Sequence, residues 1–128
     1  MTILLDTHVF LWAISEQHGK LSRNARQLIE QPSNRLLLSA ASLWEITLKI
    51  QVGKLHLPAA KEFFIQEMSH LNVETMAIVA AHVLDTLTLP AHHVDPFDRI
   101  LAAQSRVEQI PLVTADPLVR KYPIETIW

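Results

Sequence analysis

The sequence predicts an α/β fold in which a mostly parallel sheet of four to five strands is covered by helices on both faces. Strand-like and helical segments alternate along the 128 residues, and this order is typical of a parallel sheet. Apolar residues make up 49% of the chain, which is enough for a hydrophobic core. No linker, internal repeat or low-complexity segment interrupts the pattern, so we expect a single domain over residues 1–128.

The expected elements follow from apolar periodicity and from the residues that flank each segment. Strands are predicted at Thr2–Leu5, Arg35–Leu38, Leu71–Glu74, Leu112–Thr114 and Ile124–Ile127. Helices are predicted at Thr7–Ile14, Arg23–Gln31, Ala40–Val52, Pro58–Ser69, Met76–Leu87 and Asp95–Gln109. Ser22 is suited to cap the second helix, and Gly53 is suited to end the third.

The composition excludes several kinds of chemistry. The chain has no cysteine, so disulfides, thiolate nucleophiles and cysteine-based zinc sites are absent, which fits a cytoplasmic protein. Two glycines are too few for a Gly-rich phosphate loop. The net charge of -2 gives no general attraction for nucleic acid. We find no export signal and no apolar run near the roughly 20 residues that span a bilayer.

Four acidic residues occupy positions that a parallel sheet brings together. Asp6 follows the first strand and Asp116 follows the fourth, while Asp98 lies in the first turn of the helix that leads into the fourth strand. Glu45 lies on the helix that leaves the second strand. Ligands of open α/β sheets bind outside the carboxyl ends of the strands, where the strand order reverses. If the first and fourth strands are neighbours, these acids share one crevice.

Carboxylates that share a crevice repel one another, so they need a compensating cation or must partly retain their protons. Their hard oxygen atoms suit Mg²⁺ or Mn²⁺. Such ions activate water and orient phosphodiesters. No Ser-His-Asp order and no Cys-His pair offers a competing chemistry in this sequence.

Each acid also has a purely structural interpretation. Asp6, Asp95 and Asp116 stand where helix N-caps belong, and proline follows Asp95 and Asp116 directly, as it does at the first position of many helices. Asp98 would then be the third residue of a capping box that begins at Asp95. Capping alone does not require three aspartates, however, because serine or threonine serves equally well.

The helix predicted over Ala40–Val52 carries further candidates. Glu45 precedes Lys49 by four residues, the favoured spacing for a helical ion pair. Three lysines could form a strip facing RNA, although a solvated helix surface explains them as well: Lys49, Lys54 and Lys61. We expect Trp44 to be a core residue rather than a platform for base stacking.

Several residues near the acids are candidates for supporting roles. Thr7 and Thr114 could hold the site through their hydroxyl groups, or could simply end strands. Arg99 could bind a phosphate or pair with a neighbouring carboxylate. His92 and His93 lie close to Asp95, where exposed loop histidines are more common than metal or RNA contacts.

Four motifs in series resemble PIN-domain proteins, with the closest resemblance to the VapC-type toxins of bacterial toxin–antitoxin modules. They are Leu4-Leu5-Asp6-Thr7-His8 through Leu11-Trp12, Ser42-Leu43-Trp44-Glu45-Ile46, Asp95-Pro96-Phe97-Asp98-Arg99 through Ala102-Ala103-Gln104, and Leu112-Val113-Thr114-Ala115-Asp116. Together they span essentially the whole chain.

The resemblance implies a three-layer α/β/α sandwich and an endoribonuclease that depends on Mg²⁺ or Mn²⁺. It also implies a homodimer, an RNA substrate and a cognate antitoxin of a type II toxin–antitoxin pair. The family's acidic positions match Asp6, Glu45, Asp98 and Asp116 as catalytic and metal-binding residues. Asp98 is preferred over Asp95 because it directly precedes the helical Ile-Leu-Ala-Ala stretch, and Asp95 stays a further candidate ligand.

These expectations give one main hypothesis and two alternatives. In the main hypothesis, metal-activated water attacks the scissile RNA phosphodiester. In the first alternative, Asp6 is the nucleophile of a phosphoryl-transfer protein, which is disfavoured because His8 replaces the second acid expected two residues on. In the second, the chain is an inactive module that binds RNA or protein.

Overall fold

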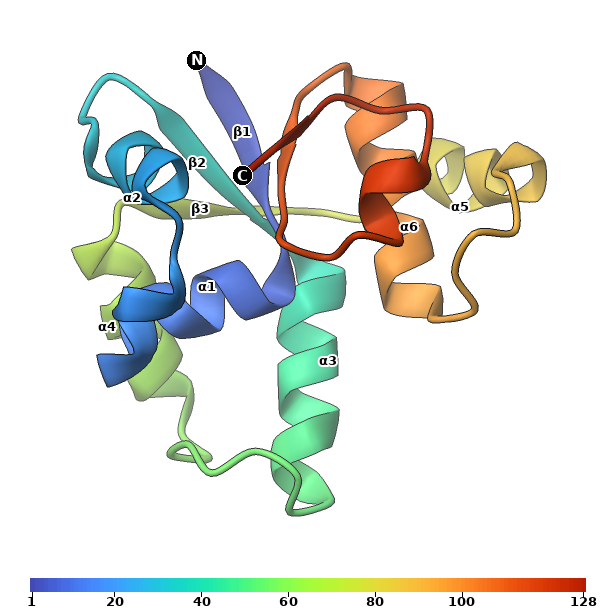
Figure 1. The fold of residues 1–128 in the computed structure, drawn as a ribbon. Coiled ribbons are helices and arrows are strands. Elements are labelled where there is room, and N and C mark those ends of the chain that lie inside the picture. The colour runs from blue at the N-terminus through green and yellow to red at the C-terminus, as the bar shows by residue number, and fades with distance from the viewer.

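A parallel five-stranded sheet forms the centre of the computed structural model, which describes residues 1–128 (Figure 1). The strands are β1 (Thr2–Leu5), β2 (Arg35–Ser39), β3 (Val73–Met76), β4 (Leu112–Val113) and β5 (Thr126–Ile127). The helices are α1 (Thr7–Ile14), α2 (Arg23–Glu30), α3 (Ala40–Gln51), α4 (Lys61–His70), α5 (Ala80–Asp85) and α6 (Pro96–Glu108). Three short 3₁₀ helices join them: η1 (Glu16–Lys20), η2 (Thr86–Thr88) and η3 (Val119–Lys121).

The strand order, β3-β2-β1-β4-β5, places β1 at the centre of the sheet. β1 pairs with β2 on one side, with Leu5 opposite Leu38, and with β4 on the other, with Leu5 opposite Val113. The chain first moves outward from β1 to β3 and then returns to the other side of β1. The order therefore reverses between β1 and β4, which confirms that the first and fourth strands are neighbours.

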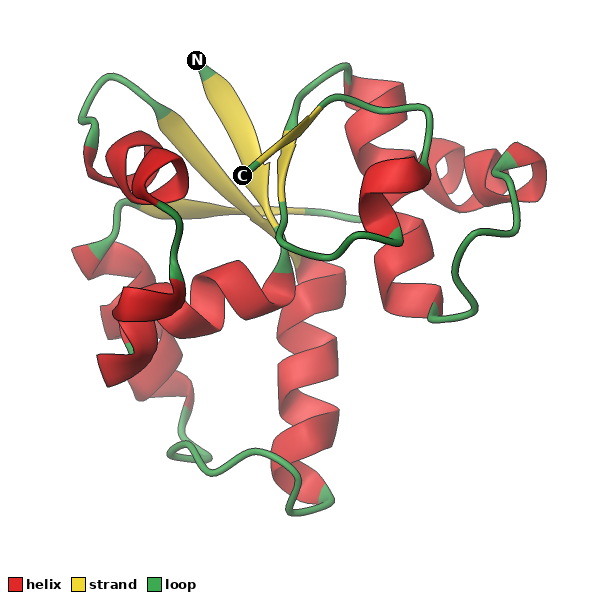
Figure 2. Ribbon diagram, in the orientation of Figure 1, coloured by secondary structure: helices red, strands yellow, loops and turns green.

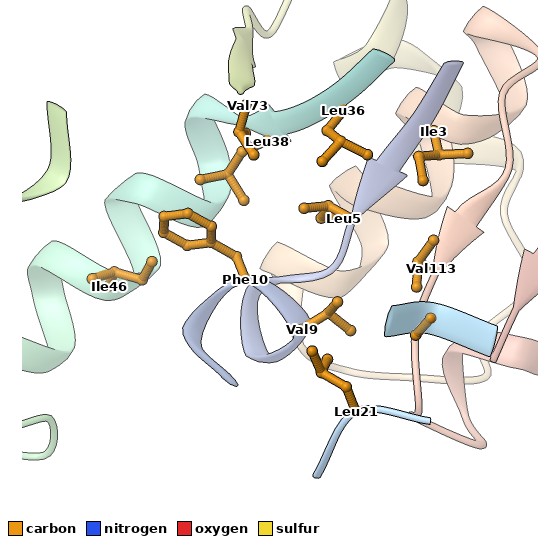
Figure 3. Packing of buried hydrophobic residues seen from close by; sticks show 11 residues of the cluster. Ile3, Leu5, Val9, Phe10, Leu21, Leu36, Leu38, Ile46, Val73 and Val113 are labelled. Atoms are coloured by element: carbon orange, nitrogen blue, oxygen red, sulfur yellow. The ribbon is translucent and has the colours of Figure 1, made fainter. Parts of the chain in front are cut away.

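Alternate residues of the central strands face opposite sides of the sheet, as the period of two in a β-strand requires. Ile3, Leu5, Leu36 and Leu38 join a core cluster with Val9 and Phe10 of α1 (Figure 3). The intervening Leu4 and Leu37 pack with Leu101 of α6 and Val119. Helices cover both faces (Figure 2), so the predicted α/β sandwich is confirmed.

Helix α3 begins directly at the carboxyl end of β2. Ser39 caps it by accepting a hydrogen bond from the amide of Ala41 at 3.0 Å. In Figure 1 the helix runs away from the strand ends, with α1 and α4 on one side and α5 and α6 on the other. Its buried face contains Ser42, Glu45 and Ile46. This arrangement places a helical carboxylate beside the switch point of the sheet.

Most predicted bounds agree closely with the structure. The starts of α4, β3 and α5 all lie later in the sequence than predicted, for physical reasons. Helix α4 begins at Lys61 rather than Pro58, since a proline fixes only its own φ and leaves the next residues free to be extended. Strand β3 begins at Val73 because Asn72 adopts a left-handed φ of 54°. Met76 belongs to this strand, opposite Ser39, so α5 begins later than predicted.

Trp44 is a further correction. Its residue is 62% exposed, because it lies on the side of α3 away from Ser42, Glu45 and Ile46. The expectation of a core position was therefore wrong. None of the helices is both long enough and apolar enough to cross a membrane.

Candidate functional site: a carboxylate cluster at the switch point

Asp6 lies immediately after β1 and is only 1% exposed. Its Oδ1 accepts the amide N–H of Thr7 at 2.7 Å, which caps α1. Its Oδ2 accepts the hydroxyl of Thr114 at 2.5 Å. Burial raises the pKa of Asp6, although His8 and the hydrogen bonds from Thr114 and Thr7 act in the opposite direction. A buried carboxylate is thus fixed by the first residue of α1 and by the threonine that follows β4.

The two supporting threonines bind other parts of the site. The hydroxyl of Thr7 donates to Oγ of Ser42 at 2.9 Å and so joins α1 to α3. Thr114 Oγ1 accepts the amide N–H of Asp116 at 3.1 Å while donating to Asp6. Both threonines are buried. They determine the relative positions of the acidic residues rather than merely ending strands.

Glu45 enters the site from α3, and its two carboxylate oxygens have different surroundings. Oε2 accepts a hydrogen bond from Nζ of Lys49 at 2.8 Å. Oε1 is buried and has no hydrogen-bond partner. An unpaired buried carboxylate oxygen is costly, because the group has lost its water without replacement. Oε1 is therefore an atom of the site that could coordinate a cation.

The two acids at the start of α6 have separate roles. Asp95 Oδ1 accepts the amide N–H of Phe97 at 2.8 Å and caps the helix. Asp98 does not complete the predicted capping box, because the amide N–H of Asp95 donates instead to Nδ1 of His93 at 3.2 Å. Asp98 Oδ2 lies 3.0 Å from Nε2 of His93. Asp98 thus faces the cluster and Asp95 shapes the turn.

Asp116 reaches the site from the loop after β4. Its Oδ1 accepts the amide N–H of Leu118 at 2.8 Å, which closes a turn ahead of η3. Its Oδ2 lies 3.3 Å from Nε2 of His93. Asp116 therefore stabilises a local turn. The sequence had suggested that Asp116 is the N-cap of the following helix, but Leu118 occupies that position. One oxygen shapes the loop while the other faces the site.

His93 is the main residue whose position differs from the expectation of an exposed loop histidine. Ligand atoms of His93, Asp98 and Asp116 all lie within 4.8 Å of one another. Tyr122 fixes the loop, because its hydroxyl accepts the amide N–H of His93 at 3.1 Å. Neighbouring His92 is exposed, so the expectation holds for one histidine only. The spacing His-x-Asp-x-x-Asp was the sequence signal available.

The hydrogen bonds also fix the protonation pattern of two histidines. Nδ1 of His93 accepts the amide of Asp95, so in the neutral ring the proton lies on Nε2, which faces Asp98 and Asp116. Nε2 of His8 accepts the amide of Ala115 at 3.3 Å. Its Nδ1, 3.5 Å from Asp6 Oδ2, then carries the proton. Both rings direct N–H groups to the carboxylates in this arrangement, and His93 also forms a group with Asp98 and Asp116 that could hold a metal ion.

Arg99 does not reach the carboxylates with its guanidinium group. It donates to the backbone carbonyls of Thr86 and Pro90, each at 2.9 Å. A longer contact of 3.4 Å reaches the hydroxyl of Tyr122. Its support is therefore indirect, through the segment and the tyrosine that hold His93.

The charges of the cluster act most strongly on Asp98. Burial, followed by the negative charges of four neighbouring acids, raises the pKa of Asp98 to about 8. Those acids are Asp6, Asp95, Glu45 and Asp116. Asp98 therefore retains its proton at neutral pH unless a cation replaces it. The carboxylate oxygens of the cluster and the unpaired Oε1 of Glu45 fit a hard divalent ion.

Comparison with known proteins gives the family. The family model of the PIN domain matches residues 3–125. The chain belongs to the PIN domain family. Proteins of this family are generally nucleases and generally use divalent metal ions. No curated protein sequence matches the chain at a significant level.

Three solved structures share the PIN fold of this chain. VapBC2 from Rickettsia felis, bound to a promoter DNA fragment, has a TM-score of 0.73 at 17% identity and covers 99% of this chain and 98% of its own. DNA-bound VapBC from Salmonella typhimurium has a TM-score of 0.72 at 16% identity, with coverages of 99% and 97%. A toxin–antitoxin complex from Klebsiella pneumoniae has a TM-score of 0.64 at 15% identity, with coverages of 98% and 96%.

Proposed function

We propose that this PIN domain is a metal-dependent endoribonuclease and the toxin of a type II toxin–antitoxin pair. The observation that carries the proposal is the unpaired, buried Oε1 of Glu45 beside a cluster of carboxylates. A structural salt bridge does not require that arrangement, whereas a cation site does. Family membership supports nuclease chemistry, and the oxygen donors support Mg²⁺ or Mn²⁺.

Each acid has a proposed role. Asp6, Glu45 and Asp98 would hold the ion, and Asp116 would bind it directly or through water. Asp95, whose Oδ1 caps α6, is a further candidate through its other oxygen. A divalent ion at this position would supply activation of water for attack on the phosphodiester and charge compensation at the leaving oxygen.

The toxin assignment is supported by the solved structures of the same fold, which are complexes of toxins with antitoxins. An antitoxin partner and a homodimer both require apolar surface. Exposed apolar side chains are present on α3 and α4, where Trp44 and Ile65 lie, and separately around α5, where Leu84 and Leu87 lie. Such residues are typical of surfaces that bind other proteins.

A decisive experiment is cleavage of total RNA by the full chain with Mg²⁺ or Mn²⁺, with the cut sites mapped. Asp6→Asn should abolish cleavage while circular dichroism shows an intact fold. EDTA should have the same effect on the wild type. Asp85→Asn is the matched control, because Asp85 pairs with Arg106 outside the cluster. Full activity of Asp6→Asn, or of the wild type in EDTA, would refute the proposal.

The same experiment addresses the alternatives. An inactive binding module would retain RNA regardless of metal and of the four acids. A phosphoryl-transfer enzyme would trap phosphate covalently on Asp6. Both oxygens of Asp6 are engaged as hydrogen-bond acceptors, which is unfavourable for nucleophilic attack.

A further inference from the structure

Lys49 is the only lysine or arginine that forms an ion pair with an acid of the cluster. Its Nζ lies 2.8 Å from Oε2 of Glu45, one helical turn away on α3. The side chain of Glu45 is 9% exposed, whereas that of Lys49 is 47% exposed. The ammonium group therefore lies at the outer edge of the site, between the buried carboxylates and solvent.

The surroundings of Lys49 differ from those of an ordinary surface ion pair, which contributes little. The hydrogen bond that Lys49 donates to Glu45 raises the pKa of Lys49, and the charges of Asp95 and Asp98 on α6 act in the same direction. The ammonium thus faces acids of two helices at once. Lys49 therefore supplies a positive charge beside a site that contains five carboxyl groups.

A phosphodiester that enters this site brings additional negative charge. The other donors around the carboxylates are the hydroxyl of Thr114 and the N–H groups of His8 and His93. The guanidinium of Arg99 is occupied by backbone carbonyls. A flexible lysine with an exposed end is the group best able to turn toward a phosphate.

We propose that Lys49 is a phosphate-contact residue that Glu45 holds at the entrance of the site until a divalent ion binds. The inference rests on the proposed function. A divalent ion at Oε1 and the ammonium group at Oε2 would both be attracted to the negative charge of one carboxylate. The ion and Lys49 therefore compete for Glu45. Once the ion is bound, the weakened pair leaves Lys49 free to contact the RNA backbone.

The proposal predicts opposite effects of one substitution on two ligands. Lys49→Gln should bind Mn²⁺ more tightly, by about threefold to tenfold, because a competing positive charge is lost. The same variant should bind a single-stranded RNA oligonucleotide about tenfold more weakly. The slope of log affinity against log salt should also fall by about 0.7, the value for one lost phosphate contact on a single strand.

Mn²⁺ binding can be followed by the electron paramagnetic resonance signal of the free ion. RNA binding can be followed by fluorescence anisotropy in Ca²⁺, with a gel to verify that the RNA stays intact. Arg23→Gln is the matched control, because Arg23 is exposed at the start of α2 and has no ion-pair partner. It should leave the affinity for Mn²⁺ unchanged and alter that for RNA by less than about twofold.

An unchanged or weaker affinity of Lys49→Gln for Mn²⁺ would overturn the inference, as would a loss of RNA affinity no larger than that of Arg23→Gln. These outcomes are distinct from a failure of the proposed function. If the wild type neither binds nor cleaves RNA, the proposed function itself is wrong. If the wild type does both and Lys49→Gln behaves like the control, only the role of Lys49 is refuted.

Discussion

Asp98 should make the metal-free protein less stable as the pH rises. The pKa of its carboxyl group is raised from 3.8 to about 8 in the folded chain. Between these values the folded state binds one proton more than the unfolded state, so the free energy of unfolding falls with increasing pH. The stabilisation that comes from protonated Asp98 is fully present below the pKa of Asp98 in the unfolded chain. It is lost as the pH rises through the pKa of Asp98 in the folded chain.

The size of this effect follows from the shift. Each pKa unit corresponds to about 1.4 kcal/mol, so a fully expressed shift would amount to about 6 kcal/mol. Solvent has partial access to the carboxyl group and screens its neighbours, which reduces the expected loss to about 2–3 kcal/mol. For a chain of this length, that corresponds to a decrease in Tm of about 10 °C between about pH 5 and pH 8.

Thermal unfolding in EDTA should be measured across this pH range for the wild type and for Asp98→Asn, which mimics the protonated acid. Other contributions to the pH dependence are common to both proteins, so the difference between the two proteins is the informative quantity. We expect the variant to be more stable than the wild type at the upper end of the range only. Mg²⁺ should restore the wild type there and have less effect on the variant.

A difference that does not change with pH would refute this reasoning. So would a wild-type stability that rises with pH relative to Asp98→Asn. Either result would mean that Asp98 is ionised in the metal-free protein, and that its four acidic neighbours are more distant or better solvated than the structure indicates.

Two further predictions concern the groups that hold the carboxylates. Thr114→Val removes the hydrogen bond to Asp6 and the acceptor of the Asp116 amide. Urea titration should therefore show a free energy of unfolding that is lower by about 2–4 kcal/mol. A decrease no larger than that of the exposed Thr47→Val would contradict this prediction. His93→Leu should lower the free energy of unfolding of the metal-free protein by about 1–3 kcal/mol, because Asp98 and Asp116 lose a shared hydrogen-bond donor. Mg²⁺ should restore part of this stability. His92→Leu is its control, and equal losses in both variants would show that the donor is unimportant.

The fold was predictable because its signals are local and repeated. The continuous apolar run from Ile3 to Leu5, followed by an acid suited to N-capping, predicted both β1 and the start of α1 at the observed residues. The pairing of β1 with β4 was a condition for the acids to meet rather than a prediction, and the structure fulfils it. The left-handed Asn72 was not predictable from this pattern, and it displaced β3 by two residues.

The positions of the acids were predictable for the same reason, since strand ends meet at one edge of a parallel sheet. Their hydrogen bonds were not. The orientation of His93 depends on Tyr122, a residue 29 positions later in the sequence. Likewise, no local pattern indicates that one oxygen of Glu45 is paired and the other is not. Such features arise only when distant segments are packed together.

The start of α6 illustrates how structural and chemical requirements are divided in this protein. A capping box would have used the side chain of Asp98 to bind the amide of Asp95. His93 accepts that amide instead, which leaves Asp98 free to face the other carboxylates at the cost of an unfavourable charge. The histidine therefore substitutes for Asp98 in stabilising the turn and also directs an N–H group to it. A helix start that needed only stability would gain from the simpler box. Under the proposed function, the observed arrangement keeps Asp98 available to a cation.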